Sequence, residues 1–336
     1  HRAQAMCYAY IFALQNNMET IGIQMTYCNL ETEQTKYFRE EFSFEEIKKW
    51  FDDLMEEYGK WATFQCEMKN QRQASIKELD FPFEYRPGQK KLVSDVYRTI
   101  MRQKLLFMQA PTGVGKTIST IFPAVKAVGE ELADRIFYLT AKTITATVAK
   151  ETFALLEKNG YRAKTIQITA KEKLCPCDEM ECNPVTCPYA KGHFDRVNDA
   201  VFDLLHRCEM IERDDILSQA DRYTVCPFEL CLDTASWCDN IICDYNYVFD
   251  PNVYLKRFFQ EGIKGDYIFL IDEAHNMVER SRQMYSAQIY KEDFLTVKRI
   301  MKEHSRSIEK ALEKCNKILL GMKRECENYT VYDTFG

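Results

Sequence analysis

The chain has 336 residues, of which 46% are hydrophobic and 29% are charged, and its formal net charge is −6. This composition is typical of a soluble globular protein and excludes a chain that is mostly disordered. No apolar run approaches the roughly 18 residues of a membrane-spanning helix, so no association with a membrane is expected. Since the net charge is slightly negative, any binding of nucleic acid would depend on local basic patches.

The beginning of the chain indicates its compartment. HRAQAMCYAYIFALQ has neither the basic segment nor the cleavage site of a secretory signal, which predicts a cytoplasmic protein. Thiols stay reduced there, so the 14 cysteines are expected to bind metal or to be buried rather than to form disulfides. The chain begins at His1 without a methionine and ends at Gly336 without a capping signal, and we therefore expect a fragment of a longer protein.

The amino-terminal part is predicted to be mainly helical. The apolar run AQAMCYAYIFALQN at 3–16 indicates a helix, and GIQMTYC at 22–28 indicates a strand because it is rich in β-branched and aromatic residues. Between 39 and 79 apolar residues recur at helical spacing. Ser43 is the expected N-cap of this helix, and Glu46 would complete a capping box.

Beyond residue 81 short apolar runs alternate with helix-like segments. The runs are LLFMQA, IFYLTA, NIICDY and YIFLID, at 105–110, 136–141, 240–245 and 267–272. Continuous apolar strands that alternate with helices indicate a parallel sheet with helices on both faces. From 290 to 322 the chain is again expected to be helical. The sequence therefore predicts an α/β fold.

A phosphate-binding loop is predicted at APTGVGKT, from Ala110 to Thr117, between the first apolar run and an apolar helix. Gly113 and Gly115 allow the backbone to approach an anion at the helix N-terminus. Lys116 would reach the β- and γ-phosphates, and the Thr117 hydroxyl would bind Mg²⁺. Ala110 stands where the generic pattern has its first glycine, and an ordinary strand-to-helix turn is the alternative.

A second polar segment, LIDEAHNM at 270–277, ends the last apolar run. A carboxylate at the carboxyl end of a parallel strand lies on the side of the sheet where ligands bind. Asp272 would hold Mg²⁺, and Glu273 would orient the water that attacks the γ-phosphate. Without the loop, the same residues could be a polar strand end.

The two motifs together resemble the first motor domain of superfamily 2 nucleic-acid helicases. The resemblance implies a RecA-like sheet that uses ATP and Mg²⁺. FEYRPGQ resembles the adenine-reading motif of that family, IFYLTAKT resembles the segment that contacts the DNA backbone, and the histidine of D-E-A-H couples the two sites. The residues implied in these roles are Arg86 and Gln89 for adenine, Thr140, Lys142 and Thr143 for DNA, and His275 for the coupling.

Four cysteines between the motifs resemble the XPD/DinG group of these helicases, whose members carry a [4Fe–4S] cluster there. The ligands that the resemblance implies are Cys175, Cys182, Cys187 and Cys226. The spacings C-x6-C and C-x4-C, followed by a gap of 38 residues, lack the C-x-x-C pairs typical of zinc sites and suit an iron–sulfur cluster. Zinc stays an alternative, and Cys177 could replace Cys175. Basic and aromatic residues that would bind single-stranded DNA nearby are Lys171, Lys173, Tyr189, Lys191, His193, Phe194 and Arg196; scattered surface charge is the alternative.

The ends of the chain resemble further parts of such helicases. Gln4 and Tyr8 form Q-x-x-x-Y, which resembles the last motif of RecB-like PD-(D/E)xK nucleases that some bacterial XPD/DinG-like helicases carry, although helix packing alone also explains it. The carboxyl-terminal helices resemble the start of the arch domain. The expected domains are a nuclease remnant at 1–30, a helical linker at 31–80, the motor domain at 81–173 and 227–290, the cluster domain at 174–226 and the start of the arch at 291–336.

The expected function is that of an ATP-dependent DNA helicase that moves 5′ to 3′. Its partners would be single-stranded and forked DNA, and it would act as a monomer. Two alternatives remain open. The chain could be a nucleotide-gated DNA clamp without unwinding, or a P-loop ATPase with a zinc-binding insertion.

Overall fold

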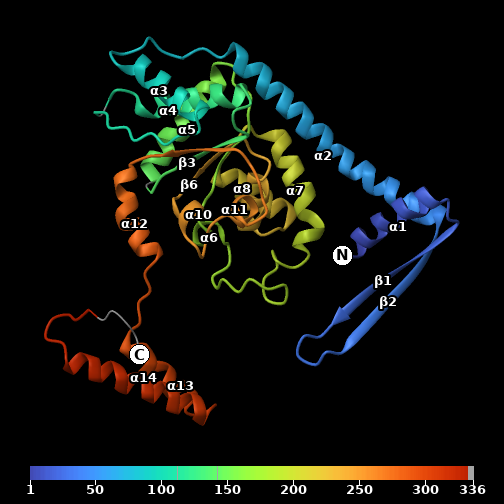
Figure 1. Ribbon diagram of the computed structural model, residues 1–336, viewed down its shortest axis with the longest axis vertical. Helices are drawn as coiled ribbons and strands as arrows, with labels where there is room; N and C mark the ends of the chain where they lie inside the picture. Colours follow the sequence, from blue (N-terminus) through green and yellow to red (C-terminus); the bar gives the residue numbers. More distant parts are fainter. Residues whose placement is uncertain (112, 142, 332–336) are drawn as a thin grey trace. The chain divides into compact units, whose positions relative to one another are not determined.

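The structure, a computed structural model, describes residues 1–111, 113–141 and 143–331 (Figure 1). Two compact units are distinguished along the chain. The first comprises residues 1–245 and 255–273, and the second comprises residues 246–254 together with the chain from 274 onwards. None of the helices in the described ranges has the length and apolar character needed to cross a membrane.

The first unit begins with a helix and a hairpin. Helix α1 (Arg2–Asn16) and strand β1 (Thr20–Cys28) confirm the first two predicted elements. Strand β2 (Thr35–Ser43) was not predicted, because its charged sequence lacks an apolar pattern, and it forms by antiparallel pairing with β1 along its whole length. Helix α2 (Phe44–Glu78) begins at the predicted N-cap, and both hydrogen bonds of the Ser43–Glu46 capping box are present.

Helix α2 belongs to two hydrophobic clusters. Ile47, near its start, packs with Met6 and Ala9 of α1 and Ile23 of β1. Near its other end, Ile76 joins the large core cluster of the sheet. The segment expected as a linker therefore contributes side chains to the core at its carboxyl-terminal end.

A five-stranded parallel sheet forms the centre of the first unit, with strand order β5-β4-β6-β3-β7. Its strands are β3 (Arg135–Leu139), β4 (Thr165–Gln167), β5 (Met210–Ile211), β6 (Asn240–Cys243) and β7 (Tyr267–Ile271). Strands β3, β6 and β7 confirm three of the four predicted runs. Strands β4 and β5 are two or three residues long, too short to give a sequence pattern.

The prediction of a strand at 105–110 was wrong. The structure assigns no strand to this segment, and the side chains of Leu105 and Phe107 are 89% and 88% exposed. Within the described ranges the sheet ends at β7, and no other strand lies along the segment. An apolar run becomes a buried strand only when it has a pairing partner, and here it has none.

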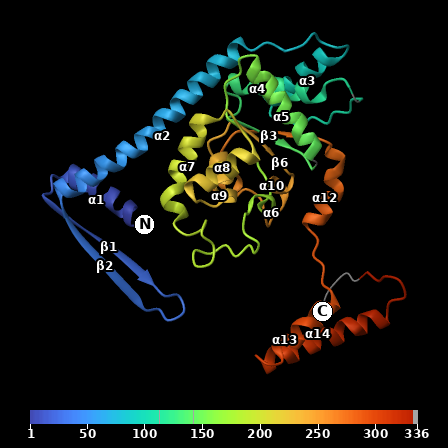
Figure 2. The same ribbon diagram turned by 180° about the vertical axis from the view of Figure 1, so that it is seen from behind.

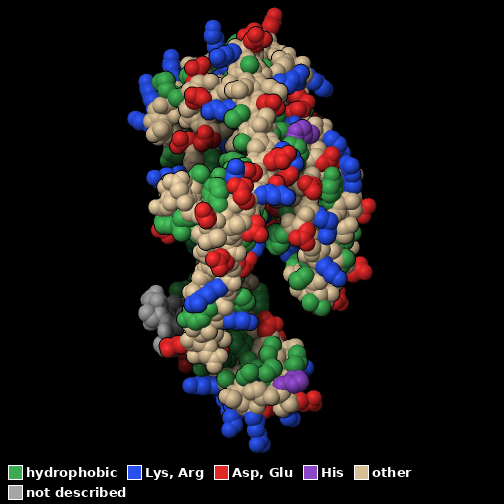
Figure 3. Space-filling view, turned by 90° about the vertical axis from the view of Figure 1, so that its right-hand side faces the viewer, with side chains coloured by type: hydrophobic (Ala, Val, Ile, Leu, Met, Phe, Trp, Pro, Cys, Tyr) green, Lys and Arg blue, Asp and Glu red, His purple; other side chains and the backbone are tan. Residues whose placement is uncertain are grey.

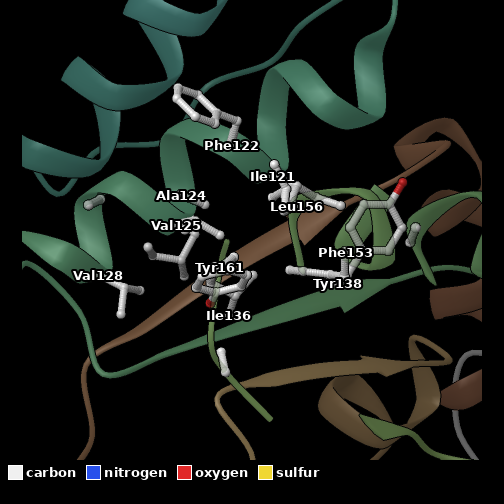
Figure 4. Packing of buried hydrophobic residues seen from close by; sticks show 14 of the residues in the cluster. Ile121, Phe122, Ala124, Val125, Val128, Ile136, Tyr138, Phe153, Leu156 and Tyr161 are labelled. Atoms are coloured by element: carbon white, nitrogen blue, oxygen red, sulfur yellow. The ribbon is translucent and has the colours of Figure 1, made fainter. Parts of the chain in front are cut away.

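Helices cover both faces of the sheet, which confirms the predicted α/β class of RecA-like type. Helices α4 (Lys116–Gly129) and α5 (Thr143–Lys158) pack on one face, where Ile121, Val125, Phe153 and Leu156 meet Ile136 and Tyr138 (Figure 4). On the other face, Phe137 of β3 contacts Phe258 and Phe259 of α11 (Lys256–Phe259), with ring centroids 5.3 and 5.2 Å apart. Figure 2 shows α4 and α5 beside β3 and β6 from behind.

The cysteine region is made of short helices and a long loop. Helix α6 (Lys171–Leu174) ends just before Cys175, and a loop without regular structure follows up to residue 192. The elements that follow are α7 (His193–Arg207), β5, α8 (Arg213–Tyr223) and α9 (Pro227–Ala235). Because β5 pairs with β4, the region expected as a separate cluster domain contributes a strand to the main sheet.

The second unit consists of helices. They are α10 (Asn246–Phe249), the 3₁₀ helix η1 (Ala274–Asn276), α12 (Met277–Met284), α13 (Lys291–Met301) and α14 (Arg306–Arg324). Helices α13 and α14 pack together and are joined by an ion pair between Lys298 and Glu313. They confirm that the segment from 290 to 322 is helical.

Candidate functional site

The predicted phosphate-binding loop has the backbone that its chemistry needs. Gly113 and Gly115 adopt φ angles of 85° and 76°, in the left-handed region that favours glycine. Gly115 caps helix α4, which starts at Lys116, so free backbone N–H groups and the positive end of the helix dipole face the loop. The Lys116 ammonium donates a hydrogen bond to the carbonyl of Ala110, at 3.2 Å. In this structure the lysine side chain therefore bonds to the first residue of the loop to which it belongs.

Arg86 and Gln89 lie directly against this loop. Gln89, the first residue of α3 (Gln89–Met101), is only 4% exposed; its side-chain oxygen accepts from the N–H of Arg86 at 3.0 Å, and its amide donates to the Val114 carbonyl at 3.2 Å. The Arg86 guanidinium donates to the carbonyl of Gly113. A Cβ atom on Gly115 would stand 2.7 Å from the Gln89 amide nitrogen. The motif expected to read adenine thus also holds the loop in shape, which the sequence pattern did not reveal.

Asp272 and Glu273 follow the carboxyl end of β7. The N–H of Asp272 donates to the Leu139 carbonyl of β3 at 3.0 Å, and the N–H of Glu273 donates to the Asp272 carboxylate at 3.0 Å. Glu273 is exposed and has a φ of 49°. Such a conformation is uncommon for a residue with a side chain and is concentrated at functional sites.

Two buried tyrosines lie on strands or strand ends near Asp272. Tyr245 follows β6 and is fully buried, and its hydroxyl donates to the carbonyl of Asp272. Tyr138 of β3 is 2% exposed. Burial raises the pKa of Tyr138 far above its usual range, and the Asp272 charge raises it further, so the phenol stays protonated.

Of the residues predicted to contact DNA, Thr140 is buried and Lys142 lies outside the described residues. Thr140 follows β3 and is 5% exposed, and its hydroxyl is hydrogen-bonded to that of Thr145. Contact between Thr140 and DNA therefore requires this end of the strand to open. Lys142 lies outside the described residues, as does the side chain of Thr143. His275 is exposed in η1 and belongs to the second unit.

The predicted cluster ligands are distributed over one loop and one helix start. Cys175 follows α6, Cys182 and Cys187 lie in the loop, and Cys226 is the N-cap of α9. The pKa of Cys177 is raised to about 11. Desolvation is the largest cause, and the thiols of Cys187 and Cys175 contribute further.

Cys226 interacts instead with Cys182. Burial raises the pKa of Cys226, and Cys182 adds to this effect. The Cys182 side chain is the main cause that raises the pKa of Lys171.

The donor chemistry fits an iron–sulfur cluster, since all 14 cysteines of the chain are free thiols and five of them lie in the loop or at the start of α9, namely Cys175, Cys177, Cys182, Cys187 and Cys226. The positions of the side chains do not fit a cluster. Among the residues that the structure describes, no group of three or more His, Cys, Asp or Glu side chains is arranged to hold a metal ion. The binding of a cluster through Cys175, Cys182, Cys187 and Cys226 therefore requires the loop at 175–192 to rearrange.

The predicted basic and aromatic surface is smaller than expected. Lys173, Lys191 and Phe194 are exposed, but the prediction of His193 as a surface residue was wrong, because it is 4% exposed and accepts a hydrogen bond from the N–H of Cys226 at 3.2 Å. The Arg196 guanidinium is occupied by backbone carbonyls, which include that of Thr224 at 2.6 Å. On the face shown in Figure 3, basic and acidic side chains are interspersed.

Gln4 and Tyr8 lie on one side of α1, where the Gln4 amide donates to the Tyr8 hydroxyl at 3.3 Å. Both line a shallow hollow with Met25, Tyr27 and Cys28 of β1. The helix-and-strand setting expected for Q-x-x-x-Y is present, but its relation to a nuclease stays a prediction.

Comparison with known proteins adds the family context. Residues 150–294, which include the cysteine region and Asp272, match the family model DEAD_2. The regulator of telomere elongation helicase 1 of Rattus norvegicus is 20% identical over 59% of this chain, and the XPD/RAD3 helicase subunit of general transcription and DNA repair factor IIH of Saccharomyces cerevisiae is 23% identical over 59%.

The chain spans only 19% and 29% of the length of these two relatives. A solved structure titled XPD_Helicase is 18% identical, covers 70% of this chain and 40% of its own, and has a TM-score of 0.48. Over part of its length the chain is therefore similar to the DEAD_2 family and to these helicases.

Proposed function

We propose that this chain is the first motor domain of an ATP-dependent DNA helicase. The observation that carries the proposal is the glycine loop before helix α4, in which Gly113 and Gly115 adopt φ angles of 85° and 76° and Lys116 begins the helix. Thr117 stands in the first turn of α4, beside the glycine loop, and Asp272 stands at the carboxyl end of β7. A hydroxyl and a carboxylate beside a helix N-terminus are the groups that bind Mg²⁺ and nucleotide phosphates in P-loop NTPases.

Hydrolysis of ATP at this site depends on positioning and charge. The Lys116 ammonium exchanges the Ala110 carbonyl for the β- and γ-phosphates, and Thr117 and Asp272 hold Mg²⁺. Glu273 orients the attacking water. Arg86 and Gln89 contact the adenine base while they hold the loop, so that occupancy of the base site and the shape of the loop are connected.

The motor acts on DNA through the end of β3 and the start of α5. We place single-stranded and forked DNA beside Thr140, Lys142 and Thr143, with His275 as the link to the nucleotide site. Movement is 5′ to 3′ and the active form is a monomer. The exposed side chains of Lys173, Lys191 and Phe194 extend the DNA track onto the cysteine region.

The cysteine region holds a [4Fe–4S] cluster in this proposal. Cys175, Cys182, Cys187 and Cys226 are the ligands, and Cys177 is the alternative to Cys175. When bound, the cluster supplies iron–thiolate bonds that cross-link the loop to the start of α9. His193 helps to hold the start of α9 in place, because its ring accepts a hydrogen bond from the N–H of Cys226.

Removal of one thiol tests this assignment. Cys226→Ser is expected to lose iron and sulfide when the protein is purified anaerobically and assayed, because the helix-start ligand is missing. Cys177→Ser is expected to retain both. Cys208→Ser, at the end of α7, serves as the matched control. Full iron occupancy in Cys226→Ser, or zinc in place of iron, would overturn the cluster.

Strand separation distinguishes a helicase from a DNA clamp. We propose that a second motor domain lies outside residues 1–336 and supplies an arginine to the γ-phosphate, a contribution typically worth about 10³–10⁵ in rate. The complete protein is expected to unwind a 5′-tailed duplex in a fluorescence assay with ATP, and residues 1–336 alone are expected to unwind none. ATP turnover by the complete protein without strand separation would favour the clamp.

A further inference from the structure

Tyr245 is a buried residue to which the mechanism so far assigns no task. It follows the end of β6 by two residues, and its side chain is fully buried. Strand β3 lies between β6 and β7 in the sheet, so Tyr245 and Asp272 follow the carboxyl ends of two strands that are not neighbours. Ligands bind at this edge of a parallel sheet. The partners of the Tyr245 hydroxyl therefore bear on the nucleotide site.

The Tyr245 hydroxyl lies against the main chain of the D-E-A-H segment. It donates a hydrogen bond to the Asp272 carbonyl, and the Glu273 carbonyl accepts from the same hydroxyl at 3.4 Å. A phenol has one proton to donate, so the two carbonyls share it in a three-centre hydrogen bond. These carbonyls belong to the two peptide units that flank the Glu273 Cα atom. One hydroxyl therefore restrains the main chain on both sides of Glu273.

Glu273 needs such a restraint because of its backbone conformation. Its φ of 49° is in the left-handed region, which is unfavourable for a residue with a Cβ atom. A residue other than glycine stays in such a conformation only where the surrounding structure imposes it. Before Glu273, the Asp272 N–H donates to the Leu139 carbonyl at 3.0 Å; directly after Glu273, the chain passes into the second unit. The Tyr245 hydroxyl adds a contact from the buried interior.

We propose that Tyr245 is a positioning residue for ATP hydrolysis, whose hydroxyl holds the two peptide units around Glu273 and thereby fixes the direction in which the Glu273 side chain leaves the main chain. The inference rests on the proposed function and deepens it. Glu273 orients the attacking water, and a displacement of about 1 Å in such a group can lower the rate about a hundredfold. Tyr245 contacts neither nucleotide nor water in this role and acts through Glu273.

The test is steady-state ATP hydrolysis by the complete protein with saturating single-stranded DNA. Tyr245→Phe keeps the buried ring and removes only the hydroxyl. This variant is expected to lower kcat by roughly 10- to 100-fold, because Glu273 is no longer held in place. KM and the Kd for a fluorescent nucleotide should be unchanged, because the phosphate loop and the side chains of Thr117 and Asp272 are intact.

The matched control is Tyr161→Phe. Tyr161 is 2% exposed, and its hydroxyl donates to the side chain of Asn240, at the start of β6, at 3.4 Å. This variant also loses one buried hydroxyl, but at the opposite end of the strand from Tyr245, so its kcat should equal that of the unmodified protein. Melting temperatures of the two variants show whether the losses of stability are comparable.

A double variant shows whether Tyr245 acts through Glu273. When two residues act as a unit, removal of the second costs little once the first is gone. In the Glu273→Gln background, Tyr245→Phe is therefore expected to slow single-turnover hydrolysis by less than about twofold. A further loss in that background as large as in the unmodified protein would show that the tyrosine acts elsewhere, and would overturn the inference.

Failure of the proposed function and failure of this inference give different results. If the complete protein hydrolyses no ATP, the proposed function fails and the inference with it. If the protein hydrolyses ATP and Tyr245→Phe keeps the normal kcat, only the inference is wrong. If Tyr245→Phe loses nucleotide binding together with turnover, the residue holds the fold and not Glu273 in particular, and the inference is again wrong.

Discussion

Replacement of Glu273 by glutamine is expected to lower ATP turnover by the complete protein at least about a hundredfold, because positioning and polarising the attacking water is its whole role. Nucleotide binding should persist, since the loop, Thr117 and Asp272 are unchanged. Steady-state phosphate release and binding of a fluorescent nucleotide measure the two quantities separately.

Glutamine at position 273 has the same shape as glutamate and lacks its charge. The contact of Glu273 with Asp272 runs through its main-chain N–H, which glutamine retains. Glu279→Gln, an exposed position on α12, is the matched control and should leave turnover unchanged. Lys116→Ala is expected to abolish turnover by removing the charge that holds the phosphates. Near-normal turnover in Glu273→Gln or Lys116→Ala would contradict these roles.

Arg72→Ala is expected to destabilise the first unit by about 3–5 kcal/mol, because it leaves the carboxylate of Asp239, whose side chain is only 16% exposed, without its partner. Arg72 of α2 is 8% exposed; its guanidinium pairs with the Asp239 carboxylate and donates to the Asp134 carbonyl at 3.3 Å. The other oxygen of Asp239 accepts from the N–H of Lys164 at 2.8 Å. Urea unfolding of the purified chain measures the loss.

A surface pair on the same helix is the control for Arg72→Ala. Lys69 and Glu131 stand 3.2 Å apart with side chains 59% and 68% exposed, so Lys69→Ala should cost less than about 1 kcal/mol. Equal losses in the two variants would show that the pair formed by Arg72 and Asp239 does not anchor α2.

The deficit of Arg72→Ala should also depend on pH. Burial raises the pKa of Asp239, and Arg72 lowers it. Without the arginine the pKa of Asp239 rises further in the folded state, while the unfolded value is unchanged. The folded variant then takes up a proton more readily than the unfolded chain, so the deficit should shrink as the pH falls below neutral.

Those parts of the fold that depend on apolar patterning could be predicted from the sequence. The runs of β3 and β6 are buried on both faces, the run of β7 is continuously apolar although Phe269 and Ile271 are exposed, and the capping box of α2 is a local signal. The other elements depend on whether a segment has a strand to pair with. Strand β2 forms because β1 lies beside it, and the segment 105–110 forms no strand because no described strand lies beside it.

The residues of the candidate site also fall into those that the sequence predicted and those that depend on contacts in the fold. Motif residues such as Lys116 and Asp272 were found because the chemistry of phosphate binding fixes their types and spacing. The contacts of Arg86 and Gln89 with the loop, and of Tyr245 with Asp272, join residues that are far apart in the chain. No short pattern records such contacts. The prediction for His193 was wrong for the same reason. A histidine in a basic segment indicated a surface residue, but its packing buries it.

The most direct test of the helicase motor is ATP turnover by the complete protein with and without single-stranded DNA. The account predicts turnover that single-stranded DNA stimulates several-fold and that Lys116→Ala eliminates under both conditions. Turnover that is independent of DNA, or that survives Lys116→Ala, would contradict it.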